Sequence, residues 1–427
     1  MKELGALLPA LGIDKVLRNL LPANFPDDKR LVLEPVQFFA NLSKIITSYP
    51  KAVLQSYMIS KAIVTLTVAD QAVLTNGSPT TSRSDRAEFC FKHIDDALRF
   101  VVGRFFVSAT YTDKARELQE KVATELRGQF KERIDTLEWM SPEAKERAKK
   151  KVDNIQQNIG YPTANPDIRS PESVAAFYKN LNVTDSFFNN VISVRKSTVS
   201  RSFGDVLKPV NRKDLGDKIQ EPNAYYNPYV NSINILPGIS QLPLFSEALP
   251  SYATYGTLGA FVGHEILHGF DNTGREFNEN AEHVSWWDNK TISAFEERTQ
   301  CFVKQYDAFT YPIPGGKTMN TNGSITLGEN LSDAGGLRIA WDAWKKVQAK
   351  NKDLNIPGLE RFTHEELFFI FYGNAWCSSH TPEYNLKTYP TEAHAPTNHR
   401  LIGAAANSRA FREVFKCKVK EPQCELF

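Results

Sequence analysis

The stretch His264-Glu265-Ile266-Leu267-His268 constrains the fold more than any other part of the chain. Histidines four residues apart lie on one side of an α-helix, so both rings can reach one metal ion. Glu265 stays on that side, whereas Ile266 and Leu267 point the other way, towards a core. In an H-E-x-x-H pattern a zinc ion keeps an open position for water, and the glutamate takes the proton of that water. The sequence therefore predicts a buried helix that carries a metal site.

A five-residue pattern by itself is weak evidence for such a site. Histidines on a buried helix are more often hydrogen-bonded core residues than metal ligands, so a third ligand is needed. Glu329 and Asp333 lie four residues apart at the start of a predicted helix and face one side. Taken alone, this pair is better explained as acidic residues that favour the positive end of a helix dipole.

Length and charge limit the classes of protein to be considered. The chain has 427 residues, of which 41% are hydrophobic, which suffices for a sizeable core and favours two or more domains. Its 51 basic and 49 acidic side chains give a net charge of +2, which argues against a nucleic-acid partner or a polybasic membrane surface. We find neither an apolar run of about twenty residues that predicts a membrane span nor the layout of a signal peptide.

The order of the predicted elements indicates a mainly α protein with a small β component. Residues 1–200 are mainly helical in pattern, including a long charged helix over Asp113–Met140. Ser141 followed by proline is typical of the start of another helix. Asn223–Tyr226 and Ser232–Leu236 have the pattern of short strands joined by a turn.

Taken together, these features resemble the neprilysin family of zinc metallopeptidases, which includes the endothelin-converting enzymes. The likeness rests on N-A-Y-Y at 223–226, G-H-E-I-L-H-G-F-D at 263–271, G-E-N-L-S-D at 328–333, W-C at 376–377, H-A-P-T-N-H-R at 394–400 and C-E-L-F at 424–427. The order and spacing of these motifs match the family from about residue 20 to the end, and the combination is far more specific than H-E-x-x-H. The likeness is weaker over residues 1–200, and the family has N-A-F-Y more often than N-A-Y-Y.

The resemblance implies a two-lobed architecture that encloses the active site. Residues 1–204 would form part of a helical lobe that covers the site, and residues 205–427 a thermolysin-like zinc-peptidase domain. Family ectodomains are much longer, so the resemblance implies an N-terminal part outside this chain that carries the membrane anchor or signal. For the full-length form it implies an extracellular or cell-surface location.

The resemblance also assigns roles at the metal. One Zn²⁺ per chain would be bound by His264, His268 and Glu329. Glu265 would act as the general base. Asp333 would hold one ligand histidine from outside the metal sphere and fix its tautomer, and Asp271 would do the same for the other.

Further residues would act on the substrate, again by resemblance. His394 would donate a hydrogen bond to the oxyanion of the tetrahedral intermediate. Asn223 and Ala224 would hold the substrate backbone, and Arg400 would bind a substrate carbonyl near the scissile bond. The pocket for the residue after that bond would be lined by Ile239, Leu244, Phe261 and Trp376.

The implied activity is zinc-dependent endopeptidase cleavage of small peptides on the amino side of hydrophobic residues. One alternative is a catalytically silent or poorly folded truncated isoform that keeps the zinc site. Another is a metal-dependent aminopeptidase, which shares H-E-x-x-H, but the exopeptidase motif G-x-M-E-N is absent. Peptide substrates are the expected partners in the leading interpretation.

The five cysteines have neither zinc-finger nor C-x-x-C spacing, and because their number is odd at least one is unpaired within the chain. The resemblance implies a disulfide between Cys301 and Cys424. The other three match family cysteines whose partners lie outside this chain: Cys90, Cys377 and Cys417. Six N-x-S/T sequons lean slightly towards a secretory route: Asn41, Asn76, Asn182, Asn289, Asn322 and Asn330.

Overall fold

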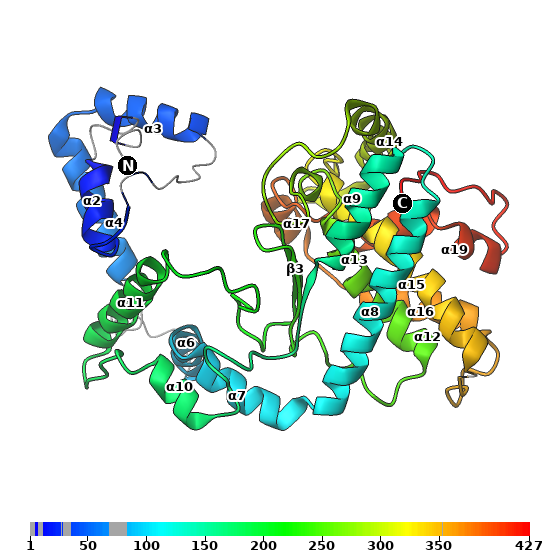
Figure 1. The fold of residues 1–427 in the computed structure, drawn as a ribbon, viewed down its shortest axis with the longest axis horizontal. Helices are drawn as coiled ribbons and strands as arrows, with labels where there is room; N and C mark the ends of the chain where they lie inside the picture. Colours follow the sequence, from blue (N-terminus) through cyan, green and yellow to red (C-terminus); the bar gives the residue numbers. More distant parts are fainter. Residues whose placement is uncertain (1–4, 7–11, 27, 29–35, 68–82, 352) are drawn as a thin grey trace. The chain divides into compact units, whose positions relative to one another are not determined.

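The computed structural model describes residues 5–6, 12–26, 28, 36–67, 83–351 and 353–427. The chain divides into two compact units, one of residues 1–102 with 170–210 and the other of residues 103–169 with 211–427. Helices dominate both units and the few strands are short (Figure 1). The prediction of a mainly helical fold with a small β component is confirmed.

The compact units do not follow the predicted boundary near residue 204. Residues 103–169 belong to the second unit because α8 (Asp113–Asp135) and α9 (Pro142–Asp153) pack there, with α8 against the helices that carry the metal site. Although α8 is highly charged, one side of it is apolar and fully buried at four-residue intervals. That side consists of Val122, Leu126, Phe130 and Ile134. The boundary implied by the resemblance did not include this contact, which forms between distant parts of the chain.

The first unit consists of helices in the part of the chain that the structure describes. They are α2 (Ile13–Leu20), α3 (Val36–Ser48), α4 (Lys51–Thr67), α6 (Arg83–Ala97), α10 (Pro171–Phe177) and α11 (Phe187–Gly204), while α7 (Arg99–Thr110) begins in this unit. The ring of Phe100 packs edge-on against Phe177 at 4.8 Å, and the Arg201 guanidinium lies 3.7 Å from the centre of the Phe177 ring. These contacts join α7, α10 and α11.

The second unit contains a three-stranded sheet beside α13 (Ala260–His268), named the metal-bearing helix because it carries the candidate ligands His264 and His268. Its strands are β1 (Gln156–Ile159), β2 (Ala224–Asn227) and β3 (Ser232–Ile235), in the order β1-β3-β2. β1 runs parallel to the fully buried β3, and β2 runs antiparallel to it. Among the described residues β2 is therefore an edge strand, and it packs against the metal-bearing helix. A separate hairpin is formed by β4 (Thr310–Ile313) and β5 (Lys317–Asn320).

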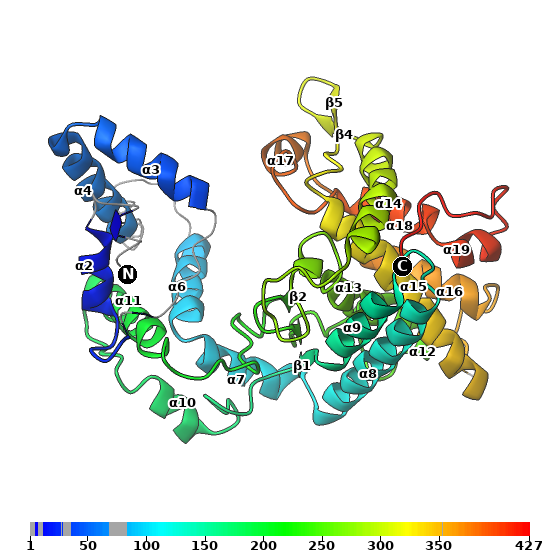
Figure 2. The ribbon, with the colours of Figure 1, turned by 45° about the horizontal axis from the view of Figure 1, so that its top comes forward.

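Two helices in direct contact form the centre of the second unit (Figure 2). α13 (Ala260–His268) continues a helical run made of α12 (Ser251–Thr254) and the π-helical turn η3 (Tyr255–Gly259), and it packs along α15 (Leu327–Lys350). Ile266 and Leu267 are fully buried, as expected. The remaining helices are η4 (Gly274–Glu276), α14 (Asn289–Asp307), α16 (His364–Ala375), α17 (Pro382–Thr388), α18 (Thr397–Ala406) and α19 (Arg409–Val414).

The C-terminal residues are held against this unit by a disulfide, a hydrogen bond and a buried aromatic ring. Cys301 on α14 and Cys424 form a disulfide with 5.7 Å between their Cα atoms, the pairing that the resemblance implied. The indole N–H of Trp139 donates to the carbonyl of Leu426 at 2.9 Å, and Phe427 is buried near the Phe130 ring. The remaining cysteines are free thiols: Cys90, Cys377 and Cys417.

Not every sequon can carry a glycan in the folded protein. Asn330 is fully buried on α15, and its amide donates to the Thr326 hydroxyl at 2.9 Å. Asn41, Asn182, Asn289 and Asn322 are exposed, while Asn76 lies outside the described residues. Across the described part of the chain, no helix combines the length and apolarity that a membrane crossing requires.

Candidate active site

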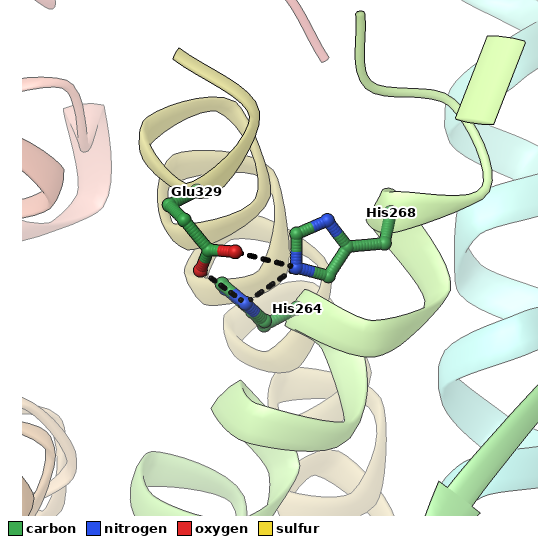
Figure 3. A group of neighbouring side chains, drawn as sticks. All are labelled: His264, His268 and Glu329. Atoms are coloured by element: carbon green, nitrogen blue, oxygen red, sulfur yellow. Dashed lines mark hydrogen bonds and ion pairs between the residues drawn. The ribbon is translucent and has the colours of Figure 1, made fainter. Parts of the chain in front are cut away.

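Three side chains from two helices converge as the ligands of one metal ion would (Figure 3). His264 and His268 point from α13 with their Nε2 atoms 2.9 Å apart. Glu329 points from α15, and its two carboxylate oxygens lie 3.2 Å and 3.4 Å from these nitrogens. Tetrahedral zinc with bonds of about 2.0–2.1 Å separates its ligands by about 3.3 Å. The donor set and its spacing therefore fit a zinc ion.

The charge of Glu329 suits this role. Burial opposes ionisation, but hydrogen bonds with His264 and His268 hold the pKa of the Glu329 carboxyl well below its usual range. The carboxylate is therefore available as an anionic ligand at neutral pH.

Glycines set the distance between the two helices. A methyl group added at Gly336 of α15 would lie 2.4 Å from the backbone nitrogen of His264 and 2.9 Å from the carbonyl of Ala260. One added at Gly263 of α13 would lie 2.7 Å from the Gly336 carbonyl. Because these neighbours are backbone atoms, a larger residue can fit only if the helices separate. The close approach therefore brings Glu329 within reach of both histidines.

We expect Gly336→Ala to weaken zinc binding, because moving α15 away from α13 withdraws Glu329 from the histidines. Overpacking of this kind also costs about 1–3 kcal/mol of stability. Competition with a chromogenic chelator would measure the affinity, and thermal unfolding would measure the stability. Gly128→Ala on α8 is the matched control, since a methyl group there meets nothing within 4 Å. Unchanged zinc affinity in Gly336→Ala would contradict the role of this contact.

Each of the two candidate ligand histidines has an acidic side chain beside its other ring nitrogen. Nδ1 of His268 lies 2.6 Å from Oδ2 of Asp271, and the Ser332 hydroxyl lies 3.2 Å from the same nitrogen. Nδ1 of His264 lies 2.8 Å from Oδ1 of Asp333. A carboxylate at Nδ1 favours the tautomer that leaves Nε2 free for a metal. Asp271 and Asp333 were expected in these places from the sequence, whereas Ser332, the residue before Asp333, was not.

Arg400 on α18 binds acidic residues of the site. Its Nε and Nη2 donate to the two oxygens of Asp333 at 2.8 Å and 2.7 Å, and Nη2 lies 3.3 Å from Glu329. Burial would raise the pKa of Asp333, but Arg400 outweighs it and lowers this pKa to about 2. Asp333 is thus held as an anion between Arg400 and His264. The family resemblance implied a substrate carbonyl as the partner of Arg400, and this pair with the Asp333 carboxylate was not expected.

Two further titratable groups lie beside the ligands. Glu265 is only 5% exposed, and burial raises the pKa of its carboxyl although the ligand histidines act against this. His394 is exposed, with Nε2 at 3.1 Å from Glu329 and Nδ1 at 2.7 Å from Glu392. The hydrogen bond with Glu329 raises the pKa of His394. Glu392 was not foreseen, although its place two residues before His394 is visible in the sequence.

The residues expected to bind the substrate backbone lie at the start of the edge strand. Asn223 is exposed, and its carbonyl accepts from the Leu236 N–H at 3.3 Å. Ala224 is paired with Ile235 of β3. Asn223 and β2 thus lie at the edge of the sheet, with β3 on one side of them.

Two of the expected pocket residues are in direct contact. The rings of Phe261 and Trp376 lie 5.1 Å apart, and the Arg400 guanidinium lies 4.3 Å from the Trp376 ring. Leu244 is linked to η3, because its carbonyl accepts from the Thr257 hydroxyl. Ile239 is buried in the loop that precedes Leu244. The aromatic pair therefore lies beside Arg400, which binds Asp333.

The chain matches a known protein family over most of its length. A model described as peptidase family M13 matches residues 223–425, and a second model of the same description matches residues 1–162. The chain belongs to peptidase family M13. Together the two matched ranges of this M13 chain contain the three candidate metal ligands and the whole of α8 and α9.

Individual proteins with similar sequences support the same family assignment. Neprilysin-3 of Drosophila melanogaster is 32% identical over 438 residues, covering 98% of this chain and 54% of the relative. Neprilysin of Homo sapiens is 31% identical over 420 residues, which cover 96% of this chain and 55% of that relative. The M13 chain thus spans about half the length of these relatives. The solved structure of zinc metalloprotease Zmp1 of Mycobacterium tuberculosis with an inhibitor has a similar fold, with a TM-score of 0.78, 24% identity and coverage of 93% of this chain and 60% of that one.

Proposed function

We propose that this M13 chain is a zinc-dependent endopeptidase that hydrolyses small peptides. The observation that carries the proposal is the convergence of His264, His268 and Glu329, with the buried Glu265 on the same helix as the histidines. Membership of peptidase family M13 supports the same reaction class. Peptide hydrolysis needs a Lewis acid, an activated water and a donor for the oxyanion, and this arrangement has candidates for each.

In the proposed mechanism each protein group has one task. Zinc, when bound, supplies Lewis acidity and lowers the pKa of a water molecule. Glu265 accepts the proton of the attacking water and returns it to the leaving amine, a task helped by a carboxyl whose pKa burial has raised. His394, oriented by Glu392, donates to the developing oxyanion. Asp271 and Asp333 hold the ligand histidines in place.

The substrate would bind as an extra strand. β2 is an edge strand beside α13, so an extended peptide can hydrogen-bond to its open side without displacing β3. The exposed Asn223 and the partly buried Ala224 lie at the start of this edge, and we assign them to the backbone of such a peptide. Pairing of this kind positions the main chain of the peptide. The choice among substrate side chains is then made by a neighbouring pocket.

We expect cleavage on the amino side of Phe, Leu, Ile or similar residues, because the side chains that would line the proposed pocket are large and apolar. Burying such a side chain contributes about 1.5–3 kcal/mol, equivalent to roughly ten- to a hundredfold in preference. Mass spectrometry of the products from a mixed peptide library would measure the preference. Trp376→Ala should reduce it, whereas Trp341→Ala on α15 serves as the matched aromatic control. A preference for charged residues after the scissile bond would refute the pocket.

The function itself is tested by metal analysis and peptide cleavage on the same preparation. We expect about one zinc per chain, loss of cleavage after chelation, and recovery when zinc is restored. Acetylating the amino terminus of the substrate should leave the rate unchanged, since an endopeptidase does not need a free amine; loss of cleavage would indicate an aminopeptidase. Bound zinc without cleavage of any peptide would identify the silent alternative.

An extracellular or cell-surface location fits the same proposal. The Cys301–Cys424 disulfide is of the kind that persists in oxidising compartments, and exposed sequons are compatible with glycosylation. Glycan release followed by mass measurement on protein from a eukaryotic host would test it, with Asn330 expected to remain unmodified because it is buried.

A further inference from the structure

A lysine with no solvent exposure lies close to the metal-bearing helix. Lys151 on α9 has 0% of its surface exposed, and the mechanism above does not use it. Lysines are almost never fully buried unless their ammonium group is paired, because desolvating an unpaired charge is costly. The partners of Lys151 therefore indicate why it is there.

Every N–H donor of this ammonium group has an acceptor. Nζ of Lys151 donates to the carbonyls of Gly269 at 2.6 Å, Gly274 at 2.7 Å and Phe277 at 2.6 Å. Gly269 follows the last residue of α13, so its carbonyl belongs to the negative end of that helix. The ring of Phe270 lies 5.3 Å from Nζ, within the range of a cation–π contact. Lys151 thus binds the segment that leaves the metal-bearing helix.

That segment carries Asp271, the partner of a metal ligand. Oδ2 of Asp271 lies 2.6 Å from Nδ1 of His268. Its Oδ1 accepts from the backbone N–H of Thr273 at 2.8 Å and of Gly274 at 2.6 Å. Two of the carbonyls held by Lys151 flank this acidic residue in the chain. The backbone that sets the position of the Asp271 carboxylate is therefore fixed from both sides by one side chain.

We propose that Lys151 is a positioning residue for the metal centre: it holds the 269–277 segment so that Asp271 keeps His268 oriented with Nε2 towards the metal. The proposal rests on the proposed function of this site. Burial lowers the pKa of Lys151 to about 7, and the negative charges of Asp271 and Glu279 act against this. The three carbonyl acceptors also favour the charged form.

The test compares zinc affinities measured by competition with a chromogenic chelator. Lys151→Met keeps the length of the side chain but removes all three donors, and we expect about ten- to a hundredfold weaker zinc binding, the range typical of partners outside the ligand sphere. Asp271→Asn should have a similar effect. Both residues act on the orientation of His268. The double variant Lys151→Met/Asp271→Asn should therefore have about the same zinc affinity as whichever single variant binds zinc less tightly. Lys149→Met, on the same helix but paired with exposed Asp135 and Glu146, should bind zinc normally.

A second measurement needs no metal. In zinc-free protein labelled with ¹⁵N-histidine, the Nδ1 proton of His268, assigned with His268→Gln, should give a downfield signal. That signal should be lost in Lys151→Met and retained in Lys149→Met. If the chain binds zinc but cleaves no peptide, the proposed function fails, whereas zinc affinity and this signal still decide the role of Lys151.

Zinc affinity within about twofold of wild type in folded Lys151→Met, or losses that add fully in the double variant, would overturn the proposal. If Lys151→Met does not fold, Lys151→Arg replaces it, since arginine keeps the charge but its planar fork fits three separate carbonyls less well. A loss of zinc affinity in folded Lys151→Arg supports the proposal, and an unchanged affinity overturns it.

Discussion

Glu265→Gln should lower peptide turnover by about two to four powers of ten while zinc remains bound. Glutamine keeps the shape of this buried side chain, but its amide cannot accept the proton of the attacking water. Since the lost interaction acts on the chemical step, the loss should fall on kcat more than on KM. Steady-state kinetics with a fluorogenic peptide, together with metal analysis of the same protein, would measure both quantities.

The matched control is Glu297→Gln, which makes the same chemical change at an exposed position on α14. It should leave kcat and zinc content unchanged. Near-normal turnover in Glu265→Gln would mean that another group takes the proton, and the proposed mechanism would be wrong. Loss of zinc together with turnover would instead show that Glu265 supports the fold of the metal site.

Glu329→Ala should reduce zinc affinity by more than the ten- to hundredfold expected at Lys151, because it removes a ligand itself. Glu329 alone among the three candidate ligands is not a histidine, and its oxygens lie 3.2 Å and 3.4 Å from the two Nε2 atoms. Its removal also leaves the positive charge of Arg400 beside the histidines with one carboxylate fewer to balance it. Both effects disfavour a dication.

Chelator competition at constant pH would measure this loss, with Asp342→Ala as the control. Asp342 is an acidic residue on the same helix that pairs with Arg338, so its removal changes the charge of α15 without touching the site. Full zinc occupancy in Glu329→Ala would show that this carboxylate is not a ligand.

The placement of His264 beside His268 could be predicted because their spacing is local, and they occupy one face of a helix whatever surrounds it. Local spacing shows only that Glu329 and Asp333 share one face of another helix, and the place of Glu329 beside the histidines was implied by the family resemblance alone. The partnership of Arg400 with Asp333 could not be predicted in this way, since it depends on how α18 packs against α15. The role of Lys151 was hidden for the same reason: its partners are backbone carbonyls more than a hundred residues away, which no side-chain motif reveals.

The predicted boundary shows the same limit at the scale of the fold. The long helix predicted over Asp113–Met140 exists but ends at Asp135, and the helix predicted to begin after Ser141 starts at Pro142. Their assignment to the second unit depends on long-range burial, such as the contact of the Phe130 ring with Phe270 at 5.0 Å. Composition along the chain carries no information about that contact.

The edge strand β2 has a consequence for how the protein behaves in concentrated solution. Open strand edges tend to pair with one another and so promote aggregation. β2 is four residues long, and Pro222 and Pro228 lie just outside it. Because proline has no N–H to continue a ladder, pairing along this edge is stopped at both ends. The strand can therefore accept one short extended segment at a time but cannot start the long pairing between copies that leads to fibres.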